Sequence, residues 1–288
     1  MSALPTDAGP EVEADTDIDG GAGTAPDADN HAPPALAEDM PPRHGHTIIG
    51  LERSWVNGRV TLEWPVHLFA GFGAQPSLEL GAFSYSSSHI SPHVQSIGRY
   101  CSIAEGVTFG HQEHPTHWLS TSSFTYDRCF MGPGPNVPLP NNLYATRSLA
   151  DTMKPGRIIV GNDVWIGFNA YIRAGTKLGD GCVVAAHAVV TRDVPPFAIV
   201  AGNPARIVRY RFDPVICREL AELEWWQYEF TRFAELDVAD VPGAIRRLRA
   251  LVADGLRPFK AELTILTAGE PTPALACERA GAAPIAPA

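Results

Sequence analysis

The sequence predicts a mainly β protein: a left-handed parallel β-helix with a long excursion loop and a C-terminal helical segment. The main observation is a six-residue period between residues 158 and 194. Aliphatic residues recur at this spacing, namely Val160, Ile166, Ile172, Leu178, Val184 and Val190. A fixed period of this length is typical of a parallel β-helix, in which each hexad forms one flat side of a triangular prism.

A second series of residues supports the same fold. Four positions after each aliphatic residue stands a small or β-branched one, in the series Val164, Ala170, Thr176, Cys182, Ala188 and Val194. The aliphatic side chains fill the prism, and the small ones pack at the next corner, where a large side chain would overfill the space. Gly161, Gly167 and Gly179 directly follow aliphatic positions, where a turn favours glycine.

The first 44 residues differ from the rest in charge and composition. They hold ten of the 32 acidic residues but only Arg43 of the 22 basic ones. Because this segment is rich in Pro, Ala and Gly and has no apolar pattern, residues 1–44 are predicted to be a disordered acidic tail. The remaining 22 acidic and 21 basic residues nearly balance, which argues against a nucleic-acid-binding protein.

Neither a signal peptide nor a membrane span is predicted, since no long apolar run is present. The five cysteines form no CxxC pair, and a cytoplasmic location is expected. Cys101 and Cys182 occupy the small position of hexads and are expected to be small buried side chains.

Residues 45–212 are predicted to form the β-helix domain. Within it, residues 45–75 are expected to be a leading β segment that caps one end, and degraded hexads begin at Leu78. The period becomes regular at Ile97 and breaks over residues 111–157. A loop of this length inside a compact domain is usually functional.

Residues 213–268 are predicted to be a helical extension. A first helix is expected from Asp213 to Phe233, with Asp213 as its N-cap and Pro214 in its first turn. A second helix is expected at about residues 241–253, and residues 269–288 are predicted to be a second disordered tail because they are rich in Ala and Pro.

Four motifs carry a family resemblance: SIGRYCSIAEGV (96–107), EHPTHWLST (113–121), IIVGNDVWIG (158–167) and VTRDVPPFAIVAGNPARIVRYRF (190–212). With the pair Trp225–Trp226, they make residues 78–233 resemble the hexapeptide-repeat xenobiotic acetyltransferases, the chloramphenicol and streptogramin acetyltransferase-like group. The resemblance implies acetyl-CoA-dependent O-acetylation of a small hydroxylated acceptor, either antibiotic-like or a surface sugar. It also implies a homotrimer with active sites between subunits, and no metal.

Direct acetyl transfer to a hydroxyl needs a base, and the ordinary pKa of histidine suits this role. In the resembling family the base is a histidine in the loop, upstream of a Ser-Thr pair, which points to His114 with Ser120 and Thr121. The position three residues later is often acidic in the family and is His117 here. The acceptor is expected to contact His117, Trp118, Ser120, Thr121 and Tyr126.

For the donor, Trp165 is expected on the outer surface, where an indole can pack along pantetheine; a subunit contact is the alternative. The resemblance implies that exposed backbone at Gly167, Ala185 and Ala186 binds the pantetheine amides. Arg206 and Arg209, clustered with Arg211, are candidates for the phosphates of coenzyme A. An ordinary solvated strand is the other interpretation of this cluster.

Two other classes of function remain open at this stage. The spacing of His111, His114 and His117 suggests a zinc-dependent enzyme of the carbonic anhydrase-like β-helix type, although Pro115 argues against a continuous helical face. A non-catalytic β-helix assembly module is the other alternative. The histidine loop and the GNPAR segment favour the acetyltransferase over both.

Overall fold

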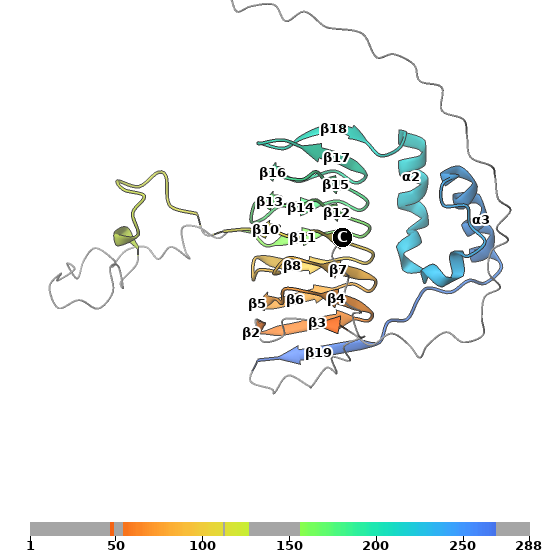
Figure 1. Cartoon of the computed structure of the whole chain (residues 1–288), viewed down its shortest axis with the longest axis horizontal. Coiled ribbons are helices and arrows are strands. Elements are labelled where there is room, and N and C mark those ends of the chain that lie inside the picture. Colours follow the sequence, from red (N-terminus) through yellow and green to blue (C-terminus); the bar gives the residue numbers. More distant parts are fainter. Residues whose placement is uncertain (1–46, 49–53, 112, 127–155, 269–288) are drawn as a thin grey trace, which may run out of the picture. The chain divides into compact units, whose positions relative to one another are not determined.

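A computed structural model describes residues 47–48, 54–111, 113–126 and 156–268, and the described residues form a stack of β coils (Figure 1). Parallel strands pair residues eighteen apart, as Trp165 pairs with Val183 and Tyr171 with Val189. Three hexads therefore make one coil. The left-handed parallel β-helix predicted from the hexads is confirmed.

The strands make three main sheets, numbered here in the order in which a coil visits them. Sheet 1 contains β1 (Thr47–Ile48), β4 (Val66–Leu68), β7 (Ser84–Ser86), β9 (Ser102–Ile103), β12 (Trp165–Ile166), β15 (Val183–Val184), β17 (Ala198–Ala201) and β18 (Arg206–Tyr210). Sheet 2 contains β10 (Thr108–Phe109), β13 (Tyr171–Ile172) and β16 (Val189–Val190). Sheet 3 contains β14 (Lys177–Leu178), β11 (Ile158–Val160), β8 (Val94–Ile97), β6 (Ser77–Leu80), β3 (Arg59–Glu63) and β19 (Leu263–Thr267), and a separate pair joins β2 (Trp55–Val56) to β5 (Gly73–Ala74).

The core lies inside the coils and consists of the two hexad series. The six aliphatic residues of the first series are each at most 2% exposed, and the small residues of the second series are at most 5% exposed. Cys101 and Cys182 are fully buried, as expected, and burial raises the pKa of each thiol to about 12. Both thiols therefore stay protonated at neutral pH and serve as packing groups.

The prediction for residues 45–75 was wrong in one respect. These residues do not form a separate cap, because β3 and β4 pair in parallel with β6 and β7 as ordinary coil strands. Alternate side chains point into the prism and are buried, namely Val60, Leu62, Trp64, Val66 and Leu68. The coils therefore begin earlier than Leu78. The sequence did not indicate these first coils, because their hexads lack the glycine that follows the aliphatic residue in the later ones.

The corner between sheet 3 and sheet 1, called the helix corner, is built from residues with positive φ: Phe83, Tyr100, Asp163, Gly181 and Phe197. At Gly181 a Cβ would lie 2.4 Å from the ring of Phe197, so only glycine fits. Phe83 stacks on Tyr100 at 4.7 Å, and Tyr100 packs on Trp225 at 4.8 Å. The helical extension therefore packs on the aromatic side chains of this corner.

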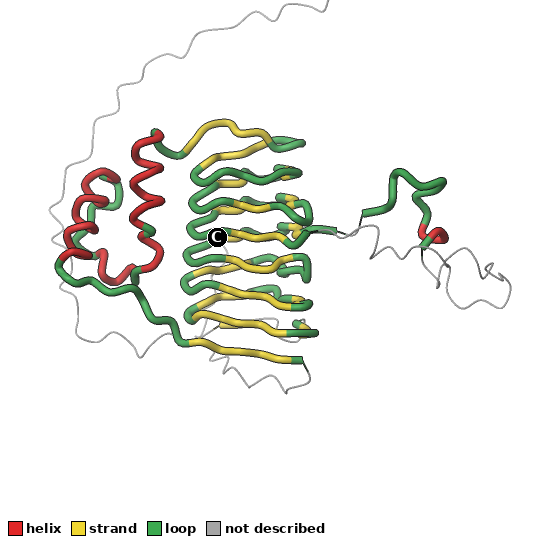
Figure 2. Tube along the Cα trace, turned by 180° about the vertical axis from the view of Figure 1, so that it is seen from behind, coloured by secondary structure: helices red, strands yellow, loops and turns green. Residues whose placement is uncertain are grey.

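The extension begins with α2 (Pro214–Leu223), and its helices lie beside the coils (Figure 2). The Asp213 carboxylate accepts hydrogen bonds from the backbone N–H groups of Val215 and Ile216. The predicted continuous helix to Phe233 was wrong. Glu224 adopts a left-handed conformation and ends α2, and two 3-10 turns follow, η3 (Trp225–Gln227) and η4 (Phe230–Phe233). This break lets Trp226 turn inward and become buried. The second helix, α3 (Val241–Ala253), is confirmed.

Strand β19 was not expected within the extension. It pairs antiparallel with β3 over five residues and places Leu266 in the core. It thereby covers the backbone groups at the end of sheet 3, which would otherwise form an open edge. The two predicted tails lie outside the described residues. None of the described helices is long and apolar enough to cross a membrane.

Candidate functional site

The histidine loop leaves the coils after β10 and returns before β11, at the corner between sheet 2 and sheet 3. One short 3-10 turn lies within it, η2 (Ser123–Thr125). The Glu113 carboxylate accepts hydrogen bonds of 2.8 and 2.9 Å from the Nε and Nη2 atoms of Arg173, which follows β13. The ion pair lowers the pKa of Glu113. It fastens the start of the loop to the prism one residue before His114.

His114 is exposed, and its ring is held by two contacts. Its Nδ1 atom lies 2.7 Å from the carbonyl oxygen of Thr121 and 2.9 Å from the hydroxyl of Tyr126. A carbonyl oxygen can only accept, so Nδ1 carries a proton in this arrangement. In the neutral ring Nε2 then has the free lone pair, and it is the nitrogen available to take a proton.

The other loop residues expected at the site lie beside His114. The ring centroid of Tyr126 is 6.0 Å from that of His114 and 6.4 Å from that of Trp118, which in turn is 6.3 Å from His117. The Ser120 hydroxyl accepts a hydrogen bond from the backbone N–H of Ser122 and shapes the turn. The structure therefore gathers the rings of His114, His117, Trp118 and Tyr126 and the Thr121 carbonyl into one group, called the loop cluster, and places Ser120 in the adjoining turn. Loop residues 127–155 lie outside the described residues.

The return of the loop is fixed by Arg157, a residue that the sequence analysis missed. Its guanidinium donates to the Ser77 hydroxyl at 3.1 Å and to the carbonyl oxygens of Ser77 and Val94. Burial lowers the pKa of this guanidinium. The position of Arg157 just before the hexads resume was the available signal, since a loop this long needs an anchor at each end.

The outer face of sheet 1 carries the residues expected to bind the donor. Strand register aligns Ser102, Trp165, Val183, Ile199 and Arg209 in one row across β9, β12, β15, β17 and β18. Trp165 is 55% exposed, as expected for an outward indole. Three strand spacings separate Trp165 from Arg209, or about 14 Å. The row is thus an outward-facing surface with an exposed indole on its second strand and an exposed guanidinium on its last.

Gly167, Ala185 and Ala186 lie together at the corner between sheet 1 and sheet 2. A Cβ at Gly167 would lie only 2.6 Å from the backbone nitrogen of Ala186 and 3.0 Å from the carbonyl carbon of Ala185. The exposed backbone expected at these three positions is found at Ala186. Gly167 is buried and donates its N–H to the Val184 carbonyl at 2.8 Å, and Ala185 donates its N–H to the Val200 carbonyl at 2.9 Å. His187 follows with a φ of 58°, and its ring meets the edge of Phe168 at 5.5 Å.

The arginine cluster divides into two parts. Arg206 and Arg209 are exposed on β18, and among the described residues they donate only to the neighbouring backbone carbonyls of Ala205 and Tyr210. Arg211 instead donates to the Asp163 carboxylate at 2.7 Å and to the Gly181 carbonyl at 2.9 Å. It braces the helix corner, so it is not part of the exposed basic surface.

The loop cluster and the donor face do not meet within one chain. His114 belongs to the corner between sheets 2 and 3, whereas Trp165 lies on sheet 1. Among the described residues, His114 and Trp165 share no contact partner. The part of the chain that the structure describes also contains no group of three or more metal-ligating side chains placed to hold a metal ion.

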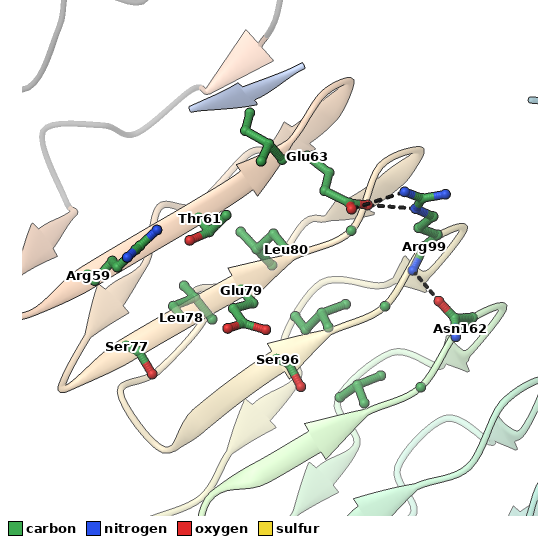
Figure 3. Close-up of a pocket in the computed structure, with 16 residues that line it drawn as sticks. Arg59, Thr61, Glu63, Ser77, Leu78, Glu79, Leu80, Ser96, Arg99 and Asn162 are labelled. Atoms are coloured by element: carbon green, nitrogen blue, oxygen red, sulfur yellow. Dashed lines mark hydrogen bonds and ion pairs between the residues drawn. The ribbon is translucent and has the colours of Figure 1, made fainter. Parts of the chain in front are cut away.

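A wide groove of about 790 Å³ lies on the outer face of sheet 3 (Figure 3). Polar, charged and aliphatic residues line it, among them Thr61, Glu79 and Leu80, and the Glu63–Arg99 ion pair closes one end with contacts of 2.6 and 3.0 Å. Arg99 also donates its backbone N–H to the Asn162 side chain at 2.9 Å. None of the expected site residues lines this groove, so it is separate from the loop cluster and from the donor face.

Comparison with known proteins agrees with this architecture. The family model for the bacterial transferase hexapeptide (six repeats) matches residues 157–192. A chloramphenicol acetyltransferase of Agrobacterium fabrum (strain C58) is 36% identical over 176 residues, covering 54% of this chain and 78% of that protein. A probable macrolide acetyltransferase of Lysinibacillus sphaericus is 34% identical over 134 residues, covering 46% and 68%. The solved structure of a galactoside acetyltransferase in complex with coenzyme A is 25% identical, with a TM-score of 0.30 and coverage of 54% and 65%.

A hexapeptide β-helix interrupted by a histidine loop, with such relatives, defines an acyltransferase. More particularly, the chain belongs to the hexapeptide-repeat xenobiotic acetyltransferases. Acetyl-CoA is the acetyl donor of this family.

Proposed function

We propose that the protein transfers the acetyl group of acetyl-CoA directly to a hydroxyl of a small acceptor, with His114 as the general base. The observation that carries this proposal is the contact between His114 Nδ1 and the Thr121 carbonyl, which leaves Nε2 free. Such an orienting contact is what a general base needs in order to present one nitrogen to its substrate.

The reaction balances with this single base. The acceptor oxygen forms a bond to the thioester carbonyl carbon while its proton passes to His114 Nε2. The carbon–sulfur bond then breaks, and the sulfur leaves as the thiolate of coenzyme A. The proton on His114 returns to that sulfur or to water, so no covalent acetyl-enzyme is needed.

The donor is proposed to lie along the outer face of sheet 1. Trp165 offers an exposed indole for the apolar part of pantetheine, and the exposed backbone at Ala186, next to Gly167 and Ala185, is the proposed contact for its amides. Arg206 and Arg209 have free guanidinium donors toward solvent, which suit the phosphates of coenzyme A. Among the described residues, neither arginine forms an ion pair.

The active site is proposed to form between subunits of a homotrimer. The loop leaves the prism at the corner between sheets 2 and 3, whereas Trp165 lies on the outer face of sheet 1. We therefore infer that one chain does not supply both to the same acceptor. In a three-fold assembly the loop of one subunit reaches the sheet 1 face of its neighbour, and all three sites are equivalent. Closed symmetry of this kind repeats a single contact three times.

The acceptor is proposed to be antibiotic-like or a surface sugar. The relatives are named for chloramphenicol and macrolides, and a galactoside is named among the solved structures. In the loop cluster, Trp118 and Tyr126 give flat apolar walls next to the polar groups of His117, Ser120 and Thr121. A small-molecule site needs such a mixture of apolar walls and a few polar contacts.

A thiol-release assay with acetyl-CoA tests the proposal against chloramphenicol, a macrolide and simple galactosides. Acceptor-dependent release of coenzyme A, with an acetyl ester found in the product by mass spectrometry, is the expected result. His114→Ala is the matched control and should abolish the release. Release without acceptor, or an acetyl group attached to the protein, would contradict direct transfer.

A further inference from the structure

A second cavity lies between the helical extension and the prism, away from the loop cluster and the donor face. Its volume is about 270 Å³. All but two of the side chains that line it are apolar, including those of Leu220 and Ile245, which are buried. The other apolar walls come from α2, α3, η3 and η4 and their connections: Phe212, Leu223, Trp225, Phe233, Leu236, Val238, Val241, Ala244 and Leu248.

The polar end of this cavity is the Asp163–Arg211 ion pair. Arg211 Nη1 donates to Asp163 Oδ2 at 2.7 Å and to the Gly181 carbonyl at 2.9 Å. Within the part of the chain that the structure describes, Asp163 Oδ1 accepts no hydrogen bond, and the Nε and Nη2 groups of Arg211 donate none. One acceptor and several donors therefore remain at the end of an otherwise apolar cavity.

We infer that this cavity binds a small neutral molecule of the phenol class, with an apolar body and one hydroxyl. The hydroxyl would donate to Asp163 Oδ1 and accept from the Arg211 guanidinium, while the ring packs among the leucines and Trp225. A hydroxyl can do both at once, because it has one donor and two lone pairs.

The charge of the ion pair selects a neutral head group. Asp163 and Arg211 neutralise one another, so a carboxylate or an ammonium would bring an unpaired charge into an apolar space, which is costly. The size also fits, because an engineered apolar cavity of about 150 Å³ binds benzene. The larger cavity here has room for a substituted ring.

The inferred site is independent of the proposed catalysis. None of the loop residues that the structure describes lines the cavity, and Trp165 lies on the outer face of sheet 1. Asp163 stands two residues before Trp165, at the turn that leads into β12. A molecule bound to Asp163 would therefore contact the turn that precedes the proposed donor strand, although binding itself can be measured without turnover.

Calorimetric titration of the full chain with 4-propylphenol, propylbenzene and 4-propylbenzoate tests the inference. Binding of 4-propylphenol is expected to be about tenfold tighter than that of propylbenzene, because hydrogen bonds to charged groups are the stronger ones. The benzoate should not bind measurably. Equal affinity for all three compounds, or no binding of the phenol at millimolar concentration, would overturn the inference.

Two variants of α3 locate the site. Ala244→Phe places a ring in the cavity and should abolish binding of 4-propylphenol, whereas Ala250→Phe adds the same ring on the exposed side of the helix and should leave binding unchanged.

Should Ala244→Phe fail to fold, NMR of the wild-type protein gives a second readout. The signal followed is the indole N–H of Trp225, which is assigned with the variant Trp225→Phe. It should shift on addition of 4-propylphenol while that of Trp165 does not. A phenol that binds with the Trp225 signal unmoved, or that binds folded Ala244→Phe normally, would place the site elsewhere.

Discussion

Glu113 and Arg173 form a two-point ion pair that ties the histidine loop to the coil strand β13. The two hydrogen bonds measure 2.8 and 2.9 Å, and both side chains remain nearly half exposed. An exposed pair contributes only about 0.2–1 kcal/mol to folding. Its effect on the position of the next residue, His114, is therefore expected to exceed its effect on stability.

Replacing Arg173 by Ala is expected to lower kcat by about 10- to 100-fold, because small displacements of a catalytic group are costly to the rate. The melting temperature should hardly change. Arg247, which lies on α3, forms a comparable exposed ion pair with Glu235, so Arg247→Ala serves as the control. Steady-state kinetics and thermal unfolding of both variants measure the difference. A normal kcat in Arg173→Ala would show that the loop is positioned by other contacts.

Most of the fold was predictable, because the hexad period states directly which side chains point inward. Val160 and Ile166 needed only their spacing to be assigned to the core. Strand β19 was not predictable, since Leu263–Thr267 has no hexad and its partner β3 lies about 200 residues earlier. The break after Leu223 was also missed, because Glu224 gives no sign of a left-handed conformation, which a glycine would have suggested.

The candidate site was predictable as a set of residues but not as a geometry. The motif indicated His114, yet the contact of its Nδ1 with the Thr121 carbonyl depends on how the loop turns back. Arg211 seemed to belong with Arg206 and Arg209 by its position in the sequence. Arg211 lies just past the end of β18, where the Asp163 carboxylate and the Gly181 carbonyl accept its hydrogen bonds at the helix corner.

The proposed intersubunit site predicts complementation between two inactive variants. A trimer that mixes His114→Ala chains with Trp165→Ala chains contains some sites with an intact histidine from one subunit and an intact tryptophan from its neighbour. Every trimer that contains both kinds of chain has one such site, so about a third of the sites in the doubly purified trimers should be active. Coexpression with two affinity tags, followed by assay of the doubly purified protein, measures this. Light scattering should give three chain masses, and an absence of recovery would place both residues in one subunit's site.

Arg209 is predicted to contribute to donor binding. Arg209→Ala should raise the KM for acetyl-CoA by about tenfold, the effect of losing a charge-assisted hydrogen bond. The KM for the acceptor should stay within about twofold. Arg246→Ala, an exposed arginine on α3, is the control. A parallel rise in both KM values would mean that Arg209 acts on the site as a whole.

The Glu63–Arg99 pair predicts a pH-dependent contribution to stability. Burial alone would raise the pKa of Glu63, but the ion pair with Arg99 and the Ala82 N–H outweigh it, so the net pKa is lowered. A lowered folded-state pKa means that the stabilisation is present above the unfolded pKa and is lost as the pH falls through the folded value. Glu63→Gln should therefore cost about 1–2 kcal/mol at pH 7. Denaturant unfolding of both proteins should show this difference shrinking below pH 4, and a constant difference would contradict the ionic origin.

The general-base role of His114 can be tested by substituting each histidine in the loop. His114→Ala should lower kcat by about 10²–10⁴-fold, the range of general-base catalysis, while the KM for acetyl-CoA and the melting temperature stay near the wild-type values, because the side chain is exposed and outside the core. His111→Ala and His117→Ala should lower kcat much less, and His117→Ala should lower it more than His111→Ala because His117 lies within the loop cluster.

Tyr126→Phe removes one of the two contacts of His114 Nδ1 but leaves the Thr121 carbonyl, so a loss of kcat of less than tenfold is expected. Added imidazole should partly restore the activity of His114→Ala, since a free base can occupy the vacated space.

If His114→Ala keeps a normal kcat while His111→Ala is inactive, the general base is His111. If all three alanine variants are inactive and the protein carries stoichiometric zinc, a metal-dependent mechanism replaces the one proposed.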